Sequence, residues 1–292
     1  MPTALPPRRL VLGIVLLALA AMPALGQTRT VETTLGTFEV PENPTRIVTT
    51  HHANTQTLLD LGIVPVGRGA VAQGYTTPEQ WAAIAEVPSI ALEGGELNYE
   101  LIASLDPDLI LEVDLASSPE RIERLRQIAP VVITPLRGED FRFGKSPQIA
   151  EVVNAVDRWE ALEAEYAARL AQIAEDYGEI AAAHPIAVLG VWASETPTVW
   201  TSDSGVGRIV APAGAVFGAA SEALPHEDGH EVIISQEDIP ATLSDVDIIF
   251  YNSFADGSAV NGELDLVREL EVFQRLPAAQ AGHVYPLGLL TV

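Results

Sequence analysis

The sequence predicts an α/β protein built from two similar lobes that are joined by a long helix. Three observations carry this prediction. Short strands and helices alternate in both halves of the chain, and a long Ala- and Glu-rich stretch separates the halves. In addition, the phrase NYELIASLDPDLILEVD at 98–114 has an imperfect echo, SQEDIPATLSDVDIIFYNS, at 235–253. One phrase in each half indicates equivalent positions in two related units.

The first lobe is expected to open with a buried strand, RIVTT, at 46–50. A helix at 55–62 should follow and close at Gly62, because glycine readily adopts the conformation that ends a helix. A second strand is expected at 64–67. The chain then continues with a helix–strand unit at 99–113, the amphipathic helix SPERIERLRQIAP and the strand VVITP. This order of elements predicts parallel strands with crossover helices.

The stretch from Ser146 to Ala183 is rich in Ala and Glu and has apolar residues at helical spacing. It predicts a short helix ending near Val156, an interruption at DRW, and then one helix of roughly 20 residues, about 30 Å long at 1.5 Å per residue. After it the α/β rhythm resumes. The elements expected there are IAVLGVW, TVWTS, GRIVAPAG, SQEDIPATL, DIIFYNS and HVYPL.

The N-terminal segment has the pattern of a secretory signal peptide. Arg8 and Arg9 precede an apolar run at 10–21, and a small-x-small site comes just before Gln27. The apolar run is short for a membrane span, so we expect cleavage and a mature chain that starts near Gln27. The alternative is an uncleaved anchor. The sequence contains no cysteine, so there is no residue to carry a lipid at the cleavage point. These features predict a protein that diffuses freely in a bacterial periplasm.

The charge of the chain excludes some partners. There are 16 basic and 40 acidic residues, a net charge of −24, and loss of the two leader arginines makes it −26. A nucleic-acid-binding protein needs a basic face for phosphate contacts, and adsorption to anionic lipid needs the same. Neither function fits this composition.

Several segments together resemble one family. RIVTTHHANTQTLLDLGIVPVG, NYELIASLDPDLIL, LRQIAPVVI, SQEDI and LPAAQAGHVYPL occur in the order found in the periplasmic substrate-binding proteins of ferric-siderophore and cobalamin ABC importers, over residues 46–287. The resemblance implies two Rossmann-like lobes on a rigid helix, with a ligand held between them. It also implies a monomer that binds a small iron chelate, has no intrinsic cofactor, and delivers its ligand to the dimeric permease of an ABC transporter.

On this basis we expect a signal peptide at 1–26, a first lobe at 27–156, a connecting helix at 157–183 and a second lobe at 184–292. Members of the family usually have one more helix after the final VYPL-type strand, whereas this sequence stops at Val292. Either the sequence is truncated or the second lobe lacks that helix.

Four histidines are candidates for the lining of a ligand cleft, and two of them follow a predicted strand on the side where α/β sheets bind ligands. His51 and His52 come directly after the first strand, and His226 and His230 lie in the loop PHEDGHE. Imidazoles at such places donate to chelate oxygens, stack on a flat ligand or coordinate a metal. The resemblance places His230 opposite the first lobe, where it is also a possible iron ligand. The alternative for His51 and His52 is a polar loop in which one of the two histidines caps the next helix, and the alternative for PHEDGHE is a solvated acidic loop.

A local basic cluster is the second candidate. LRGEDFRFGKS contains Arg137, Arg142 and the protein's one lysine, Lys145. Guanidinium groups bind carboxylate and hydroxamate oxygens in a bidentate manner, so this cluster suits an anionic chelate. The alternative is that these charges neutralise the neighbouring Glu139 and Asp140.

Tyr75 and Trp192 are candidate aromatic walls of the cleft, although either would serve equally well as ordinary core. The segment SDSGVG lacks the spacing and the lysine of a phosphate loop, so we interpret it as a turn that leads into a helix whose Arg208 faces the cleft. The resemblance does not decide among a siderophore, cobalamin and haem.

Two other functions are possible. A hydrolase is disfavoured because neither H-E-x-x-H nor G-x-S-x-G occurs, and we therefore expect no enzyme activity. A bare zinc or manganese carrier would use His51, His52 and His230 with a carboxylate such as Glu93, and these would have to converge on one ion.

Glu100 and Glu237 open the two copies of the repeated phrase. Acidic residues are favoured at a helix start, so helix capping would account for both. The resemblance instead maps them onto the acidic residues that dock to arginines of the two permease subunits.

Overall fold

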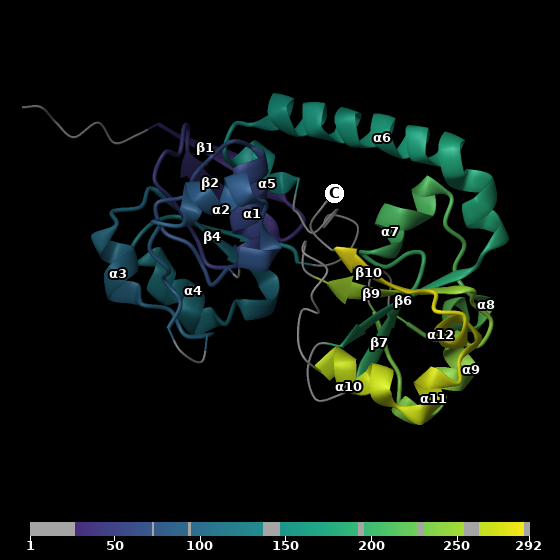
Figure 1. Ribbon diagram of the computed structural model, residues 1–292. Coiled ribbons are helices and arrows are strands. Elements are labelled where there is room, and N and C mark those ends of the chain that lie inside the picture. The colour runs from purple at the N-terminus through teal and green to yellow at the C-terminus, as the bar shows by residue number, and fades with distance from the viewer. Residues whose placement is uncertain are drawn as a thin grey trace, which may run out of the picture.

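A computed structural model describes residues 27–71, 73–92, 95–136, 147–191, 196–226, 231–253 and 263–288. The described chain forms two α/β lobes, with one long helix running along the top of the molecule between them (Figure 1). The fold class that the sequence predicts is therefore confirmed.

The first lobe contains an antiparallel hairpin and a parallel sheet. The hairpin joins β1 (Thr28–Thr33) to β2 (Gly36–Pro41). The sheet has the order β3 (Ile47–Thr49), β4 (Leu109–Val113), β5 (Val131–Thr134). Every residue of β3 and β4 is buried, as expected for a sheet whose two faces are both covered.

The strand predicted at 64–67 is reduced to a single parallel bridge between Val48 and Gly67. Val66 N donates to Ile47 O at 2.8 Å, and Thr49 N donates to Gly67 O at 3.0 Å. Pro65 precedes this pair and has no N–H to donate, so the ladder cannot extend further toward the amino end.

The helices of the first lobe are α1 (His52–Asp60), α2 (Pro78–Ile84), α3 (Tyr99–Ser104) and α4 (Pro119–Arg126), with 3₁₀ turns at Gln73–Tyr75 and Asp114–Ala116. Polar side chains start three of them, since Thr77, Asn98 and Ser118 each accept a hydrogen bond from the backbone N–H three residues ahead. Helix α1 begins three residues earlier than predicted and is closed by Gly62, whose φ is +79°.

The break before the connecting helix lies at 153–155, earlier than DRW. Helix α5 (Gln148–Val152) ends there, and α6 (Val156–Ala183) runs for 28 residues, about 42 Å, where the sequence predicts about 20. Asn154 has a φ of +57°, a left-handed conformation that asparagine tolerates better than most residues, and this turn interrupts the helix. The DRW segment instead forms the first turn of α6, where Trp159 is buried against the first lobe.

The second lobe has a mixed five-stranded sheet in the order β10 (Val284–Gly288), β9 (Ile248–Ser253), β6 (Ile186–Val191), β7 (Pro197–Trp200), β8 (Val232–Ile233). Strands β6, β9 and β10 are parallel, but β7 and β8 pair antiparallel. The lobes are thus similar and not identical. The connection between β6 and β7 is too short for a crossover helix, so β7 has to run back beside β6.

The helices of this lobe are α7 (Gly207–Val210), α8 (Ala219–Glu222), α9 (Ile239–Leu243), α10 (Glu263–Glu269), α11 (Glu271–Gln274) and α12 (Pro277–Gln280), with 3₁₀ turns at Ala211–Ala213 and Gln236–Asp238. Residues of α9 to α12 pack with those of β6 and β9 in one buried apolar cluster. A smaller cluster on the other side of the sheet contains Val188, Trp200 and Phe217.

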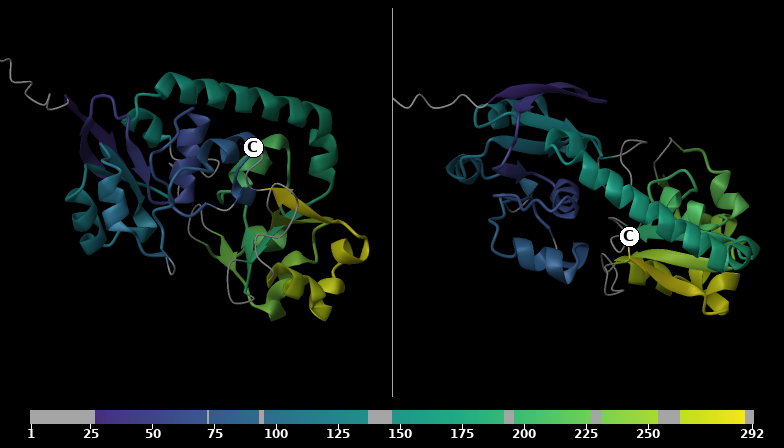
Figure 2. Two further views of the ribbon diagram at one scale, coloured as in Figure 1. Left: turned by 60° about the vertical axis from the view of Figure 1, so that its left-hand side comes forward. Right: turned by 90° about the horizontal axis from the view of Figure 1, so that it is seen from above.

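The parallel strands of the second lobe end at the gap between the lobes. In Figure 1 the arrowheads of β9 and β10 point toward the first lobe, and α1 borders the gap from the opposite side. The two further views in Figure 2 show the long helix α6 (teal) running from the first lobe to the second. Among the described residues, no helix combines the length and the apolar character needed to cross a bilayer.

Candidate ligand-binding cleft

The first-lobe side of the site is built at the carboxyl ends of β3 and β4. Strand β3 ends at Thr49, and α1 starts three residues later, which places His51 and His52 at the strand end. In open α/β sheets this edge is where ligands bind. Helix α1, which begins at His52, borders the gap between the lobes (Figure 1).

His51 is the N-cap of α1. Its Nδ1 accepts a hydrogen bond from Ala53 N at 3.2 Å, so in the neutral ring the proton is on Nε2. Burial, and to a lesser extent the positive charge of Arg121, lowers the pKa of His51 from 6.5 to about 4. The alternative interpretation, that one of the two histidines caps the next helix, is therefore confirmed, and the capping residue is His51. The ring also retains one N–H donor, on Nε2.

His52 lies against His51, with ring centroids 4.0 Å apart and the planes tilted by 36°. Burial, and then the proximity of His51, lowers the pKa of His52 to about 3. Both imidazoles are consequently neutral at pH 7. A neutral pair can donate hydrogen bonds and stack on a flat ligand, but it adds no positive charge to the site.

A charged pair, Glu112 and Arg121, lies near the His pair and was not predicted from the sequence, and the charge of Arg121 acts on His51. Glu112, the second-to-last residue of β4, is fully buried, and its Oε2 accepts a hydrogen bond from Arg121 Nε at 2.5 Å. Its Oε1 accepts from Thr50 Oγ1 at 2.6 Å and from Val113 N at 2.9 Å. The available signal was the single acidic residue inside the apolar strand LILEV, since a buried carboxylate needs a partner.

Buried hydroxyl and amide groups connect the three strand ends of this lobe. Thr134 Oγ1, at the end of β5, lies 3.0 Å from Asn54 Oδ1 and 3.1 Å from Glu112 O. Asn54 Nδ2 in turn donates to Glu112 O at 3.4 Å. These hydrogen bonds hold the start of α1 against the sheet, and they therefore fix the backbone that carries His51 and His52.

On the second-lobe side, β9 ends in two buried polar residues. Asn252 Nδ2 and Ser253 Oγ make no hydrogen bond within the described residues. Buried polar atoms without a partner are uncommon and concentrate where proteins bind ligands or ordered water. They occupy the end of a strand that points across the gap at the first lobe (Figure 1).

The segment SDSGVG is the turn that the sequence predicts, and it leads into α7 with Arg208 in its first turn. Ser202 N and Oγ each lie 2.7 Å from a carboxylate oxygen of Glu222. Arg208 N donates to Ser204 O at 2.9 Å, and its side chain is half-buried.

His226 holds the same turn. Its Nε2 is 3.0 Å from Asp203 Oδ1, and its Nδ1 is 2.7 Å from Leu224 O. The pKa of His226 is raised, mainly by its hydrogen bond to the backbone carbonyl of Leu224. Partial burial opposes this, whereas the hydrogen bond and charge of Asp203 and the charge of Glu222 add to it. Both ring nitrogens face acceptors, so the arrangement favours the doubly protonated ring. His226 is therefore part of the structure of this turn.

The remaining candidates lie outside the described residues: Arg137, Arg142, Lys145, Trp192, His230 and Glu93. The side chain of Tyr75 is also outside them, although its backbone forms part of the 3₁₀ turn at Gln73–Tyr75. Within the described part of the chain, no group of three His, Cys, Asp or Glu side chains could hold a metal ion.

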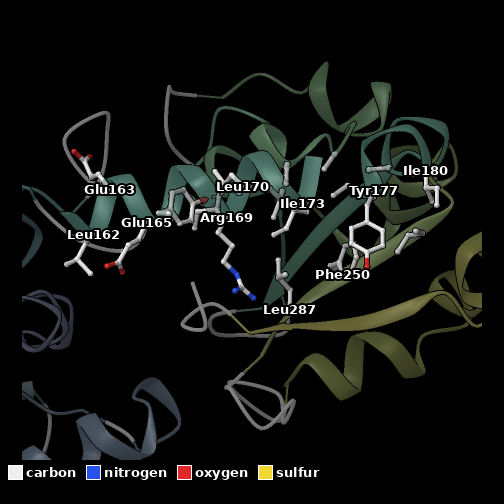
Figure 3. Close-up of a pocket in the computed structure, with 18 of the residues that line it drawn as sticks. Leu162, Glu163, Glu165, Arg169, Leu170, Ile173, Tyr177, Ile180, Phe250 and Leu287 are labelled. Atoms are coloured by element: carbon white, nitrogen blue, oxygen red, sulfur yellow. Dashed lines mark hydrogen bonds between the residues drawn. The ribbon is translucent and has the colours of Figure 1, made fainter. Parts of the chain in front are cut away.

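A cavity of about 660 Å³ lies under α6 and is mostly apolar. Side chains of α6 at helical spacing, including Leu170, Ile173 and Tyr177, point into it toward Phe250 and Leu287 (Figure 3). Neither member of the His pair lines this cavity. We therefore place the polar site at the strand ends. The cavity lies between α6 and one face of the second sheet, and it reaches Asp60 at the end of α1 in the first lobe.

Glu100 and Glu237 are both exposed, one in α3 of the first lobe and the other in the 3₁₀ turn before α9 of the second. Neither carboxylate caps its own helix, because Asn98 and Ser235 do so. The two side chains are therefore not needed for the local fold.

Two α/β lobes with a continuous helix between them, and with polar strand ends on both sides of the gap, define a two-lobed ligand-binding protein. A family model described as periplasmic binding protein matches residues 47–288. The chain belongs to this periplasmic binding protein family, whose members are substrate-binding proteins of ABC transporters.

Individual relatives agree with this assignment. The ferric enterobactin-binding periplasmic protein FepB of Escherichia coli O6:H1 is 24% identical over 305 residues, covering 97% of this chain and 91% of FepB. The probable siderophore-binding lipoprotein YfiY of Bacillus subtilis is 31% identical over 160 residues, which is 52% of this chain and 47% of YfiY. This alignment thus spans about half of YfiY.

Among solved structures, the siderophore periplasmic binding protein from the fuscachelin gene cluster of Thermobifida fusca superposes with a TM-score of 0.69. It is 27% identical in sequence, and the match covers 85% of this chain and 90% of that protein. Staphylococcus aureus SirA, solved in complex with staphyloferrin B, also superposes with a TM-score of 0.69, at 20% identity, which supports the fold alone.

Proposed function

We propose that this protein captures a ferric siderophore in the bacterial periplasm and delivers it to an ABC import permease. The observation that carries the proposal is that the strand ends of both lobes meet the gap with polar side chains: the neutral His pair on one side, and Asn252 and Ser253 on the other. An oxygen-rich chelate supplies acceptors and donors for such groups over a large surface.

The relatives support the choice of ligand. FepB is named for ferric enterobactin, YfiY for siderophore binding, and the Thermobifida protein for a siderophore gene cluster. The chain carries out no reaction in this proposal and holds no cofactor of its own.

The ligand contacts proposed from the sequence are His51, His52, Tyr75, Arg137, Arg142, Trp192, Arg208 and His230. His51 and His52 have support from their burial and neutral charge at the strand end. In this proposal the lobes are residues 27–156 and 184–292, the connecting helix carries the lobes as two rigid bodies, and the protein acts as a monomer.

The leader at 1–26 is removed on export, and the mature protein diffuses in the periplasm without a lipid anchor. The absence of cysteine from the sequence supports this location, because bacterial lipid anchors are attached to a cysteine. Glu100 and Glu237 dock to the two permease subunits, and their exposure in opposite lobes supports this role.

Native mass spectrometry of the protein isolated from its own periplasm tests the ligand. The expected result is a bound mass equal to an iron chelate, which is displaced when excess ferric chelate is added. A bound cobalamin, haem or single zinc ion would replace this proposal with the corresponding one. Titration by quenching of tryptophan fluorescence then supplies the affinity.

A further inference from the structure

The cavity under α6 changes in chemistry along its length (Figure 3). Charged side chains line the end near the first lobe, and these are Asp60, Glu163, Glu165 and Arg169. Further along the helix the lining is aliphatic or aromatic, and it consists of Leu170, Ile173, Tyr177, Ile180 and Ala181. At the far end, His184 Nδ1 lies 2.8 Å from Asp247 Oδ2. The polarity of the lining therefore falls along the axis of the cavity, away from the first lobe.

The floor of the cavity leads to the polar end of β9. Ile248 and Phe250 line the cavity, and Asn252 comes next on the same face of the strand, because side chains alternate between the two faces. Leu287 of β10 also lines the cavity, and it is the register partner of Asn252. Asn252 is 1% exposed, and its Nδ2 has no hydrogen-bond partner within the described residues. The cavity and the polar strand end are thus consecutive parts of one surface.

The apolar part of the cavity is uncovered within the described residues. Tyr177 and Ile180 are 60% and 63% exposed, although both line it. Exposed apolar side chains that lie side by side mark places where a ligand or a partner binds. The volume of about 660 Å³ is within the roughly 300–1,000 Å³ typical of small-molecule sites. The lining segment of α6 from Leu162 to Ile180 is about 27 Å long at 1.5 Å per residue, so a long and narrow ligand fits it best.

The direction of the polarity change indicates the kind of ligand. An amphipathic helix has a polar and an apolar side along its whole length, so it does not match a cavity whose two ends differ. A molecule with a polar head and an acyl chain changes from polar to apolar along its length, as the cavity does. The head then lies beside Asn252, at the strand ends of the proposed chelate site.

We propose that the cavity binds the acyl chain of an amphiphilic iron chelate, whose iron-binding head lies at the strand ends. This inference rests on the proposed function and specifies the class of its ligand, a chelate that carries a fatty acyl chain. In the complex the chain passes Leu287 and covers Phe250, Ile173 and Tyr177. Binding therefore removes apolar surface of both the chain and the protein from water.

The test uses ferric chelates that share a head and differ only in the chain. The heads are a trihydroxamate and a tris-catecholate, each without a chain and with an octanoyl or a dodecanoyl chain joined through an amide. Free dodecanoate is the probe for a chain without a head. Equilibrium dialysis with radioactive iron or labelled dodecanoate measures affinity, at concentrations below those at which the probes form micelles.

Three variants of α6 connect the binding of the chain to the cavity. Ile173→Trp fills the middle of the cavity. Ala171→Trp is the matched control, because it places the same side chain at an exposed position of α6 that does not line the cavity. Leu170→Gln makes the lining polar with little change in size, and it serves if the larger tryptophan disturbs the fold. Thermal unfolding establishes that each variant is folded.

A buried methylene raises affinity by about fourfold. At least one dodecanoyl chelate should therefore bind the wild-type protein at least about tenfold more tightly than the same head without a chain, and the octanoyl chelate should lie between them. Ile173→Trp should reduce this ratio to about threefold or less, and Leu170→Gln should also reduce it. Ala171→Trp should retain the full ratio.

The outcomes separate the two proposals. Equal affinity for acylated and chain-free chelates, or a ratio that the folded Ile173 and Leu170 variants leave unchanged, overturns this inference and leaves the iron-chelate function in place. Binding of free dodecanoate as tightly as the dodecanoyl chelates would indicate a lipid site that is independent of the chelate, and it also overturns the inference. Failure of the wild-type protein to bind any of the ferric probes overturns the iron-chelate function itself.

Discussion

Glu100 and Glu237 occupy equivalent positions in the two lobes, each two residues after the side chain that caps its helical turn. Asn98 Oδ1 accepts from Leu101 N at 3.0 Å, and Ser235 Oγ accepts from Asp238 N at 3.2 Å. Both glutamates are exposed. The repeated phrase therefore encodes the same local structure twice, a polar cap followed by an outward carboxylate.

The first prediction concerns these two carboxylates. Replacing both, Glu100→Ala with Glu237→Ala, should abolish transport and leave ligand affinity unchanged, because charged docking pairs determine encounter and register more than fold. Each single variant should have a partial effect. Uptake into vesicles reconstituted with the permease measures transport, and fluorescence titration measures affinity.

Glu120→Ala is the matched control for Glu100→Ala. Glu120 is also exposed and also lies two residues after a capping side chain, that of Ser118. It should have no effect on uptake. Wild-type uptake by the double variant would mean that the two glutamates do not dock.

The second prediction separates the two roles of His51. His51→Ala should destabilise the protein by about 1 kcal/mol, since it removes the cap of α1, and should also weaken ligand binding. His51→Asn keeps a capping side chain and loses the Nε2–H donor, so it should weaken binding at nearly wild-type stability. Urea unfolding and ligand titration of both variants distinguish the roles. Wild-type affinity in His51→Asn would leave His51 as a cap only.

The third prediction concerns the stability of the protein at acidic pH. The pKa values of His51 and His52 are lowered to about 4 and about 3, so between these values and 6.5 the unfolded chain binds more protons than the folded one. Their contribution to stability is therefore complete above about pH 6.5 and declines as the pH falls toward 4. Lowering a pKa by one corresponds to about 1.4 kcal/mol of free energy, so the pair should lose on the order of a few kcal/mol.

Thermal unfolding between pH 7 and pH 4 measures this loss. Many carboxylates titrate in the same range, so the comparison is with the double variant His51→Asn, His52→Gln, whose stability should fall less steeply. Parallel curves for the two proteins would contradict the assignment of neutral, buried rings.

The fourth prediction concerns His226, whose contribution to stability should decline as the pH rises and not as it falls. The folded-state pKa of His226 is raised, so its contribution is present below the unfolded value near 6.5 and is lost as the pH rises through the folded value. Within the described residues, Asp203 and Glu222 are the acidic groups that act on it. Burial by itself would raise the pKa of Asp203, but hydrogen bonds from Thr201 and His226 outweigh this and lower it.

His226→Gln should remove the part of the alkaline decline in stability that comes from this pair. The imidazole proton resonances of His226 should titrate above the usual range in the wild-type protein, and Asp203→Asn should bring the midpoint back down. A midpoint at or below 6.5 in the wild-type protein would show that the pair does not hold the turn at 201–206.

The fifth prediction tests the packing beside the His pair. A Cβ on Gly69 would lie 2.4 Å from Thr50 O and 2.9 Å from His51 N, both backbone atoms that cannot move aside independently. Gly69→Ala should therefore displace the start of α1 and reduce both stability and ligand affinity. Gly205→Ala is the control, because nothing lies within 4 Å of its Cβ. Equal behaviour of the two variants in unfolding and titration would contradict this arrangement.

The order and type of most elements follow from the sequence. The apolar run LILEV predicts β4, and SPER followed by periodic leucines and isoleucines predicts α4, because hydrophobic periodicity and capping residues act over a few neighbours. The position of the His pair after β3 is predicted for the same reason. The turn before α7 is likewise encoded by its own glycines and serines.

Other features depend on residues that are far apart in the chain, and only the tertiary structure decides them. Asn54 and Thr134 are 80 residues apart and join two strand ends, and Arg121 acquires its partner only when α4 packs beside β4. The interruption between α5 and α6 at Asn154 likewise depends on the packing of Trp159 in the first-lobe core. Local sequence determines which segments become helices and strands, whereas burial and long-range pairing decide which polar side chains meet and what charge they carry.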